Sequence, residues 1–243
     1  MAPLLCEAML KRTVSRIANH LFGGTCLLCR GAAQLSRGEG LLCAACDADL
    51  PRLGDALCPR CALASPDGML CGRCLVRPPG YDATLAALEY RFPADVLVHS
   101  LKFRGELALA SLLGRLLAER VTRGERVDCV LPVPLSAARL RARGYNQALE
   151  IARHAARATG TALDAQLCER SRDTQAQAEL RWAEREKNVR GAFRCTAALR
   201  GAAVAVVDDV MTTGATLNEV AATLKRAGAS RVVNWVAART FPA

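Results

Sequence analysis

Residues that could bind a sugar phosphate lie close together between Val204 and Thr216, in the stretch VAVVDDVMTTGAT. An apolar run leads into the adjacent carboxyl groups of Asp208 and Asp209, and threonines and a glycine follow. Such a run indicates a buried strand, with the aspartates at its carboxyl end and TTGAT in the turn before a helix. That turn offers unpaired backbone N–H groups at the positive end of the helix dipole, which suits a phosphate.

The order of the side chains predicts which part of a ligand each would contact. Threonine hydroxyls can add hydrogen bonds to the turn, and Gly214 lets the backbone close tightly around an anion. Asp208 and Asp209 would repel a phosphate, so we expect them to bind sugar hydroxyls or a magnesium shell. A phosphorylated ribose presents these groups in the same order. The predicted phosphate-binding residues are Thr212, Thr213, Gly214, Ala215 and Thr216.

Simpler interpretations of this stretch stay open. Asp209 could cap a helix, Asp208 could be a solvated strand end, and TTGAT could be an ordinary turn. A Walker loop is excluded because no GxxxxGK sequence followed by Ser or Thr is present. The DxD motif of haloacid dehalogenases does not match either, since Val210 and Met211 follow Asp209.

A second group of chemically active residues is a set of cysteines. Eight of the 12 form four CxxC pairs, and two facing pairs can build the tetrahedral four-sulfur cage that zinc prefers. We expect sequential pairing and two structural zinc ions, although the spacing leaves interleaved pairing, an iron–sulfur cluster or a redox CxxC open. The first predicted cage is Cys26, Cys29, Cys43 and Cys46, and the second is Cys58, Cys61, Cys71 and Cys74.

The elements that would position the sugar-phosphate residues alternate between strand and helix. Apolar runs predict strands over 83–90, 128–134, 203–210 and 231–239, and apolar residues at helical spacing predict helices over 106–121, 146–160 and 215–228. This alternation predicts an α/β fold with a parallel sheet covered on both faces, which binds ligands at the carboxyl ends of its strands. The expected domains are an amphipathic helix over 1–25, a double zinc ribbon over 26–78 and the α/β domain over 79–243.

Composition and charge limit the environment and the partners. The formal net charge is +10, which suits a polyanion such as nucleic acid or a phosphorylated metabolite, although a GC-rich coding sequence would also enrich arginine. No apolar run is long enough to span a membrane, and Glu7, Lys11 and Arg12 interrupt any signal peptide, so we expect a cytoplasmic protein. The amphipathic helix over 4–22 is expected to pack on the protein rather than lie on a membrane.

Further basic residues are candidates for phosphate contacts. Arg139, Arg141 and Arg143 alternate along the chain and could reach one anion together, or they could form a solvated basic edge. Lys102 could contact a pyrophosphate as a point charge, or it could be an ordinary exposed lysine.

The combined motifs resemble the ComF/GntX family. CLLC, CAAC, CPRC and CGRC are followed by HSLKFRG, LPVPLSAARLRARGYNQA, RDTQAQAELRWAEREKNVRGAF and VVDDVMTTGAT, the last of which resembles the ribosyl-phosphate loop of type I phosphoribosyltransferases. The resemblance runs from about residue 20 to the end of the chain. It implies a double zinc ribbon joined to a phosphoribosyltransferase domain.

The resemblance also implies roles for individual residues. Asp208 and Asp209 would contact the ribose 2′ and 3′ hydroxyls of phosphoribosyl pyrophosphate in the catalytic centre, and residues 212–216 would hold its 5′-phosphate. A turn formed by Pro132, Val133 and Pro134 would lie by the pyrophosphate, with magnesium bridging ribose and pyrophosphate. The segment over 172–193 would be a flap that closes over the substrate, unless it is an ordinary exposed helix.

Three functions remain open on the sequence. The protein could transfer the phosphoribosyl group to an unknown acceptor, or bind phosphoribosyl pyrophosphate without turnover. The resemblance to natural-competence proteins implies a third, the handling of single-stranded DNA during uptake, which the basic charge and the zinc ribbons fit. Aromatic residues that could stack on bases are scarce, with Trp182 and Tyr145 the nearby candidates.

Overall fold

The computed structural model describes residues 24–33, 41–121, 126–172 and 189–242. The expected amphipathic helix over 4–22 and most of the expected flap over 172–193 lie outside the described residues. The chain divides into two compact units, Met1–Leu50 and Pro51–Ala243, and each is described by itself. Among the described residues, no helix is both long enough and apolar enough to cross a membrane.

The first unit contains little regular structure among its described residues. Strands β1 (Gly24–Thr25) and β2 (Ala32–Ala33) pair antiparallel, and the short helix α2 (Ala44–Ala48) follows. The Sγ atom of Cys43 caps this helix by accepting a hydrogen bond from the backbone N–H of Cys46 at 3.5 Å. Such short elements bury little apolar surface, so we expect the cysteines to hold the described residues of this unit together through a bound metal.

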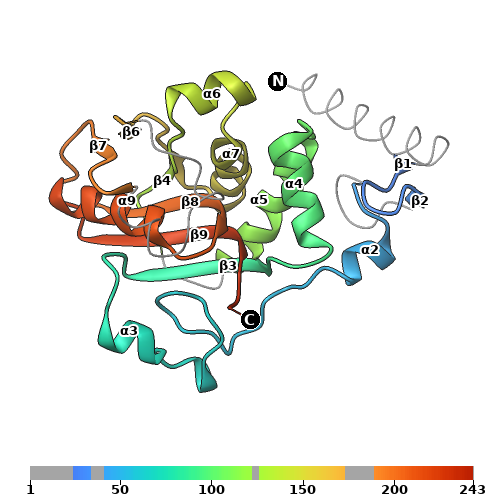
Figure 1. Ribbon diagram of the computed structural model, residues 1–243, viewed down its shortest axis with the longest axis horizontal. Helices are drawn as coiled ribbons and strands as arrows, with labels where there is room; N and C mark the ends of the chain where they lie inside the picture. Colours follow the sequence, from blue (N-terminus) through green and yellow to red (C-terminus); the bar gives the residue numbers. More distant parts are fainter. Residues whose placement is uncertain (1–23, 34–40, 122–125, 173–188, 243) are drawn as a thin grey trace, which may run out of the picture. The chain divides into compact units, whose positions relative to one another are not determined.

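A five-stranded parallel sheet forms the centre of the second unit, which confirms the predicted α/β fold (Figure 1). Its central strands are buried along almost their whole length, as the uninterrupted apolar runs predicted. Val204 to Val207 are all fully buried although successive side chains point to opposite faces, so helices and loops cover both faces of the sheet. The strand order is β3 (Ala83–Glu89), β9 (Arg231–Arg239), β8 (Ala203–Met211), β4 (Cys129–Pro132) and β5 (Ala162–Leu163).

Helices pack on this sheet at the positions that periodicity predicted. Helix α5 (Ala108–Val121) contacts β3 and β9, α7 (Gln147–Thr159) contacts β4 and β8, and α9 (Ala215–Arg226) contacts β8 and β9. The side chain of Asn146 caps α7 at its start, and Gly160 ends the helix with a left-handed backbone. Two shorter helices, α4 (Ala94–Phe103) and α6 (Ala137–Arg143), lie near the carboxyl ends of the strands (Figure 1).

The second set of cysteines belongs to the unit that contains the sheet. Helix α3 (Gly72–Val76) begins beside Cys71, and the one-turn helix η1 (Pro66–Gly68) precedes it. Thr84 of β3 donates its backbone N–H to the carbonyl of Pro59 and its hydroxyl to the carbonyl of Arg60, at 3.0 and 2.7 Å. A small antiparallel hairpin of β6 (Cys168–Arg170) and β7 (Phe193–Cys195) completes the described elements.

Candidate functional site

The eight cysteines of the CxxC pairs form two clusters in the sequential pairing. In each cluster the four Sγ atoms all lie within 4.8 Å of one another, and the Sγ atoms of Cys29 and Cys43 are 3.8 Å apart. The corresponding distance between Cys61 and Cys71 is 3.6 Å. Four sulfurs at about 2.3 Å from a tetrahedral zinc ion would be about 3.8 Å apart, so both clusters fit structural zinc.

The protonation of one thiol in each cluster also suits a metal. Burial raises the pKa of Cys58, but hydrogen bonds with the backbone of Cys71, Cys61 and Arg60 outweigh burial and lower it to about 7. Equivalent backbone hydrogen bonds lower the pKa of Cys26 to about 6. One thiol in each cluster therefore forms the metal-binding thiolate near neutral pH, whereas burial and the neighbouring cysteines raise the pKa of Cys46, Cys61 and Cys74.

The two predicted ribose carboxylates lie at the carboxyl end of β8, as expected. Asp209 is 3% exposed, and its Oδ2 atom lies 2.8 Å from the Nζ atom of Lys102, which comes from α4. Burial alone would raise the pKa of Asp209, but the Lys102 ammonium lowers it below its usual value. Burial and the neighbouring charge of Asp209 together raise the pKa of Asp208 well above its usual range. The structure thus pairs Lys102 with a carboxylate.

The predicted phosphate loop connects β8 to α9. The hydroxyl of Thr213 accepts a hydrogen bond from the backbone N–H of Ala215 at 3.1 Å, and α9 begins at Ala215. Gly214 has a φ of +81°, and an added Cβ would lie 2.7 Å from the Cε atom of Met211 and 3.0 Å from the hydroxyl of Tyr81. Only glycine fits this turn without strain, which gives a structural reason for its place in TTGAT.

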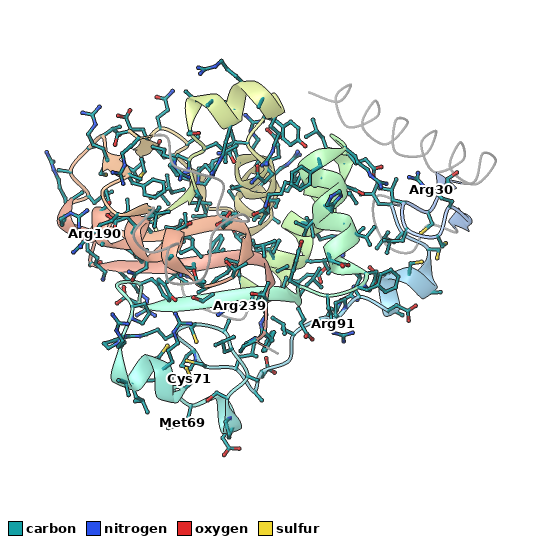
Figure 2. The ribbon with its side chains drawn as sticks, viewed as in Figure 1. Arg30, Met69, Cys71, Arg91, Arg190 and Arg239 are labelled. Carbon is teal, nitrogen blue, oxygen red and sulfur yellow. The ribbon has the colours of Figure 1, made fainter. Side chains whose placement is uncertain are left out.

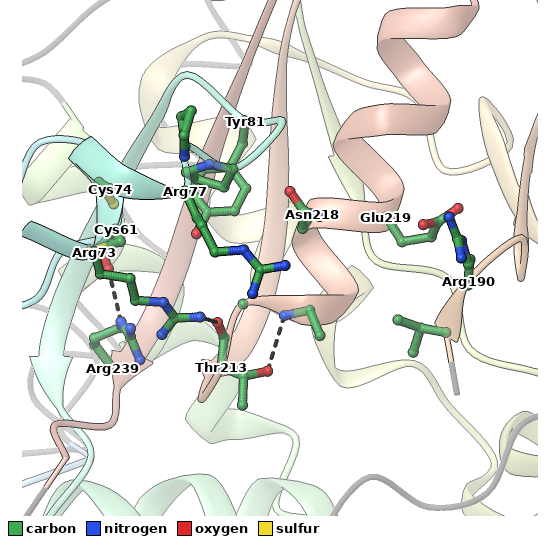
Figure 3. A pocket seen from close by; sticks show the side chains of 15 residues that line it. Cys61, Arg73, Cys74, Arg77, Tyr81, Arg190, Thr213, Asn218, Glu219 and Arg239 are labelled. Atoms are coloured by element: carbon green, nitrogen blue, oxygen red, sulfur yellow. Dashed lines mark hydrogen bonds between the residues drawn. The ribbon is translucent and has the colours of Figure 1, made fainter. Parts of the chain in front are cut away.

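A cavity of about 580 Å³ opens beside this loop, and Thr213, Gly214 and Ala215 form part of its wall. Figure 3 shows Arg73 and Arg77 extending from α3 and the segment after it toward the turn at Thr213. Arg190 and Arg239 also line the cavity, with Glu219 as an acidic group. The wall is therefore strongly basic, and sequence reasoning missed these four arginines.

Arg239 connects the second cysteine cluster to the phosphate loop. It is 1% exposed and ends β9, next to the segment that carries Cys71 (Figure 2). Its guanidinium donates to the carbonyls of Cys61 at 2.9 Å, Met211 at 2.8 Å and Thr212. The planar fork of arginine can satisfy several carbonyls at fixed angles, so this side chain fixes the start of the loop relative to the cluster.

The remaining predicted site residues lie at the end of β4, the strand that pairs with β8, and on α6. Pro132 of β4 is in register with Val207 of β8, and the backbone N–H of Val133 donates to the carbonyl of Val207 at 2.9 Å. The turn that contains Pro134 therefore begins beside Val207, the residue of β8 that directly precedes Asp208. Arg143 closes α6, where its side chain donates to Gln147 and its Cζ atom lies 5.5 Å from the ring centroid of Phe103.

The comparisons with known proteins agree with this combination of a parallel α/β sheet and two four-cysteine clusters. Residues 107–239 match the phosphoribosyl transferase domain, and residues 17–75 match the double zinc ribbon domain. The protein therefore belongs to the class in which zinc ribbons are joined to a phosphoribosyltransferase-type α/β domain.

Relatives that match along nearly their whole length identify the family within this class. The chain belongs to the ComF family, whose proteins combine a double zinc ribbon with a phosphoribosyltransferase domain. It is 37% identical over 225 residues to the DNA utilization protein YhgH of Salmonella typhimurium, covering 90% of this chain and 98% of the relative. It is 28% identical over 233 residues to Competence protein F of Haemophilus influenzae, covering 90% and 99%. A similar solved structure is the glutamine phosphoribosylpyrophosphate amidotransferase of B. subtilis, at 24% identity and a TM-score of 0.38 over 53% of this chain and 26% of that chain.

Proposed function

We propose that the protein binds phosphoribosyl pyrophosphate with magnesium at the carboxyl end of β8. In this proposal, residues 212–216 hold the 5′-phosphate, and Asp208 and Asp209 accept hydrogen bonds from the ribose hydroxyls. The observation that carries the phosphate part of the proposal is the basic cavity of about 580 Å³ whose wall includes Thr213, Gly214 and Ala215. Asp208 and Asp209 are not among its lining residues, and their part in the proposal rests on their place in β8, directly before this turn.

Charge and size both support this ligand. Phosphoribosyl pyrophosphate is a polyanion, and guanidinium groups match phosphate oxygens through paired N–H donors. The four arginines of the wall outnumber its single acid, Glu219. The volume also lies within the roughly 300–1,000 Å³ that small-molecule sites usually occupy.

The carboxylate pair fits magnesium as well as ribose. Magnesium prefers carboxylate oxygens together with water and substrate phosphates, and Asp208 is partly accessible near the carboxyl end of β8. A bound cation would offset the burial and the charge of Asp209 that raise the pKa of Asp208, and so would favour its carboxylate form. When bound, magnesium would neutralise the charge on the pyrophosphate that leaves C1. Lys102 keeps Asp209 ionised and in a fixed position through the 2.8 Å ion pair.

Phosphoribosyl transfer is the reaction that this site would support. A lone pair of the acceptor would form a bond to C1 of the ribose, and the C1–O bond would break with its electrons leaving on the pyrophosphate. The turn from Pro132 to Pro134, which begins beside β8, and the guanidinium of Arg143 are the groups that would orient the pyrophosphate.

A second candidate is a phosphoribosyl pyrophosphate binder that does not turn over and acts in DNA uptake and single-stranded DNA handling. The relatives, which are named as a DNA utilization protein and a competence protein, favour this alternative. Pyrophosphate release measured across a panel of nucleobases and amines separates the two. Release with one acceptor supports the transferase, and no release with any acceptor supports the binder.

Titration calorimetry with phosphoribosyl pyrophosphate and magnesium tests the shared part of the proposal. Binding is expected for the parent protein and is expected to disappear in the Asp208→Asn/Asp209→Asn double variant. Asp128→Asn is the matched control. The Asp128 carboxylate accepts a hydrogen bond from the backbone N–H of Ala203, which lies at the opposite end of β8 from the two aspartates. Unchanged affinity in the double variant would show that the ligand binds elsewhere.

A further inference from the structure

One tyrosine in the wall of the basic cavity has no part in the ligand contacts described above. Tyr81 is 4% exposed, and its ring belongs to the hydrophobic core of the sheet unit. It also lines the cavity of about 580 Å³, where Figure 3 shows it between Arg77 and Asn218. The side chain is therefore almost wholly inside the protein and still borders the space that a ligand would occupy.

The hydroxyl of Tyr81 forms no hydrogen bond with any residue that the structure describes. Buried tyrosine hydroxyls usually have a partner, because an unpaired buried polar group has lost the hydrogen bonds that water gives it in the unfolded chain. The hydroxyl of Tyr145, by contrast, donates to the carbonyl of Leu101. An unpaired hydroxyl on a cavity wall indicates that its partner is a molecule that enters the cavity.

The hydroxyl has a defined position relative to the predicted phosphate turn. Directly before Tyr81, the backbone N–H of Gly80 donates to the Oδ1 atom of Asn218 in α9 at 2.7 Å, which ties this segment to the helix. A Cβ atom built on Gly214 would lie 3.0 Å from the Tyr81 hydroxyl. The hydroxyl therefore lies against the glycine that directly precedes α9, within the turn over 212–216.

We propose that Tyr81 is a further ligand-binding residue, whose hydroxyl donates a hydrogen bond to the phosphate that the turn over 212–216 holds. Ionised phosphate oxygens accept hydrogen bonds, so they match a neutral O–H donor. The start of α9 adds backbone N–H groups and the positive end of a helix dipole for the same anion. This inference rests on the proposed function for the sugar phosphate, and it adds a donor from the segment between the second cysteine cluster and β3.

Titration calorimetry with two probes tests this inference, namely phosphoribosyl pyrophosphate with magnesium, and inorganic phosphate alone. Tyr81→Phe is expected to bind phosphoribosyl pyrophosphate about 10- to 100-fold more weakly than the parent, the scale for one hydrogen bond to a charged group. Its binding of inorganic phosphate is expected to weaken as well. Tyr90→Phe is the matched control, because it removes the same atom from a tyrosine that is not among the described residues lining the cavity. Its affinities should stay within about twofold of those of the parent.

The outcomes distinguish this inference from the proposed function. If the parent binds inorganic phosphate but not phosphoribosyl pyrophosphate, and Tyr81→Phe weakens the phosphate, the role of Tyr81 stands and the proposed ligand is wrong. Equal affinities of Tyr81→Phe and the parent for every probe that the parent binds would overturn the role of Tyr81 alone. No binding of either probe to the parent would contradict both.

Urea denaturation without ligand provides a second readout, which a structural role would move in the opposite direction. Tyr81→Phe removes a hydroxyl that bonds to no described residue, so its denaturation midpoint should equal or exceed that of the parent. Tyr145→Phe removes a hydroxyl that bonds to Leu101, so its midpoint should fall. A fall of similar size in Tyr81→Phe would show that its hydroxyl has a partner inside the protein and would overturn the inference.

Discussion

The two cysteine clusters use the same CxxC motif but differ in what surrounds them. The first lies in the unit that ends at Leu50, where its described backbone bonds are local ones, such as Cys26 to Gly31 and Leu27 to Leu41. The second belongs to the hydrophobic core of the sheet unit, and this core includes Cys58 and Cys61 together with Val220 and Leu224 of α9. One motif thus closes a small module, whereas the other forms part of a larger domain.

The difference matters because two arginines connect the second cluster to the predicted phosphate loop. Arg239 joins the carbonyl of Cys61 to those of Met211 and Thr212. Arg73, which lies between two zinc ligands, donates to the carbonyl of Thr213 at 3.3 Å. We therefore expect the metal of the second cluster to position the ligand site, and the metal of the first cluster to stabilise its own module.

The largest difference is expected when one ligand is removed from each cluster. Cys74→Ser should weaken binding of phosphoribosyl pyrophosphate by about tenfold to 100-fold, the scale on which ångström displacements act. The matched variant Cys46→Ser should leave the affinity within about twofold, since its cluster stabilises a separate unit. Metal analysis should give about two zinc ions in the parent and about one in each variant. Equal losses of affinity in both variants would remove the distinction between the clusters.

Arg239→Met should have the next largest effect. It removes the buried Arg239 donor from the carbonyls of Cys61 and Thr240 and one of the donors to Met211, so the free energy of unfolding should fall by on the order of 3–5 kcal/mol. Urea denaturation measures this change. Arg194→Met is the control, because Arg194 is exposed and pairs with Glu169 at the surface, where an ion pair contributes at most about 1 kcal/mol. Similar denaturation midpoints for the two variants would contradict the bridging role of Arg239.

A comparison of Gly214→Ala with Gly105→Ala separates the effect of backbone strain from the effect on ligand contacts. Gly214 and Gly105 both have left-handed backbones, at φ of +81° and +71°, so alanine should cost each about 1–2 kcal/mol of stability. A Cβ at Gly214 meets Met211 and Tyr81, whereas one at Gly105 meets nothing within 4 Å. Phosphoribosyl pyrophosphate affinity should therefore fall about tenfold in Gly214→Ala alone, by the misplacement of binding groups. An equal loss of affinity in Gly105→Ala would show that lower stability, and not a displaced binding group, weakens binding.

The smallest effect is expected for a single arginine at the cavity wall. Arg77 is exposed, so Arg77→Gln should lower the affinity for phosphoribosyl pyrophosphate only about two- to fivefold. This difference should shrink as salt rises, because exposed charges are screened. Arg30→Gln, beside the first cluster, should change nothing. Calorimetry at two salt concentrations compares the variants, and a stronger effect from Arg30 would argue against a ligand in this cavity.

Much of the fold and the centre of the site could be predicted from the sequence, because their signals lie in short continuous stretches of the chain. Apolar runs and helical periodicity located β8, β9 and α9, and the order of DD and TTGAT assigned those residues to a strand end and a turn. The two-residue strand β5 was missed, because so short a segment has no periodicity.

The basic wall of the cavity could not be predicted in this way. Arg73 lies between two zinc ligands and is separated from Thr213 by 140 residues, and only the folded chain brings them together. Arg239 is a charge that follows the uncharged run VVNWVAA at the carboxyl end of a strand, and that contrast was the signal that could have been used. Long-range contacts of this kind are not signalled by any regular spacing of residues in the sequence.

The central claim is that the turn over 212–216 holds a phosphate while Asp208 and Asp209 hold the ribose. A crystal structure of the protein with ribose 5-phosphate, magnesium and pyrophosphate tests it most directly. We predict the 5′-phosphate at the backbone N–H groups of the turn and the 2′ and 3′ hydroxyls at the two carboxylates. A sugar phosphate bound elsewhere, with this turn and both carboxylates free of ligand, would contradict the account.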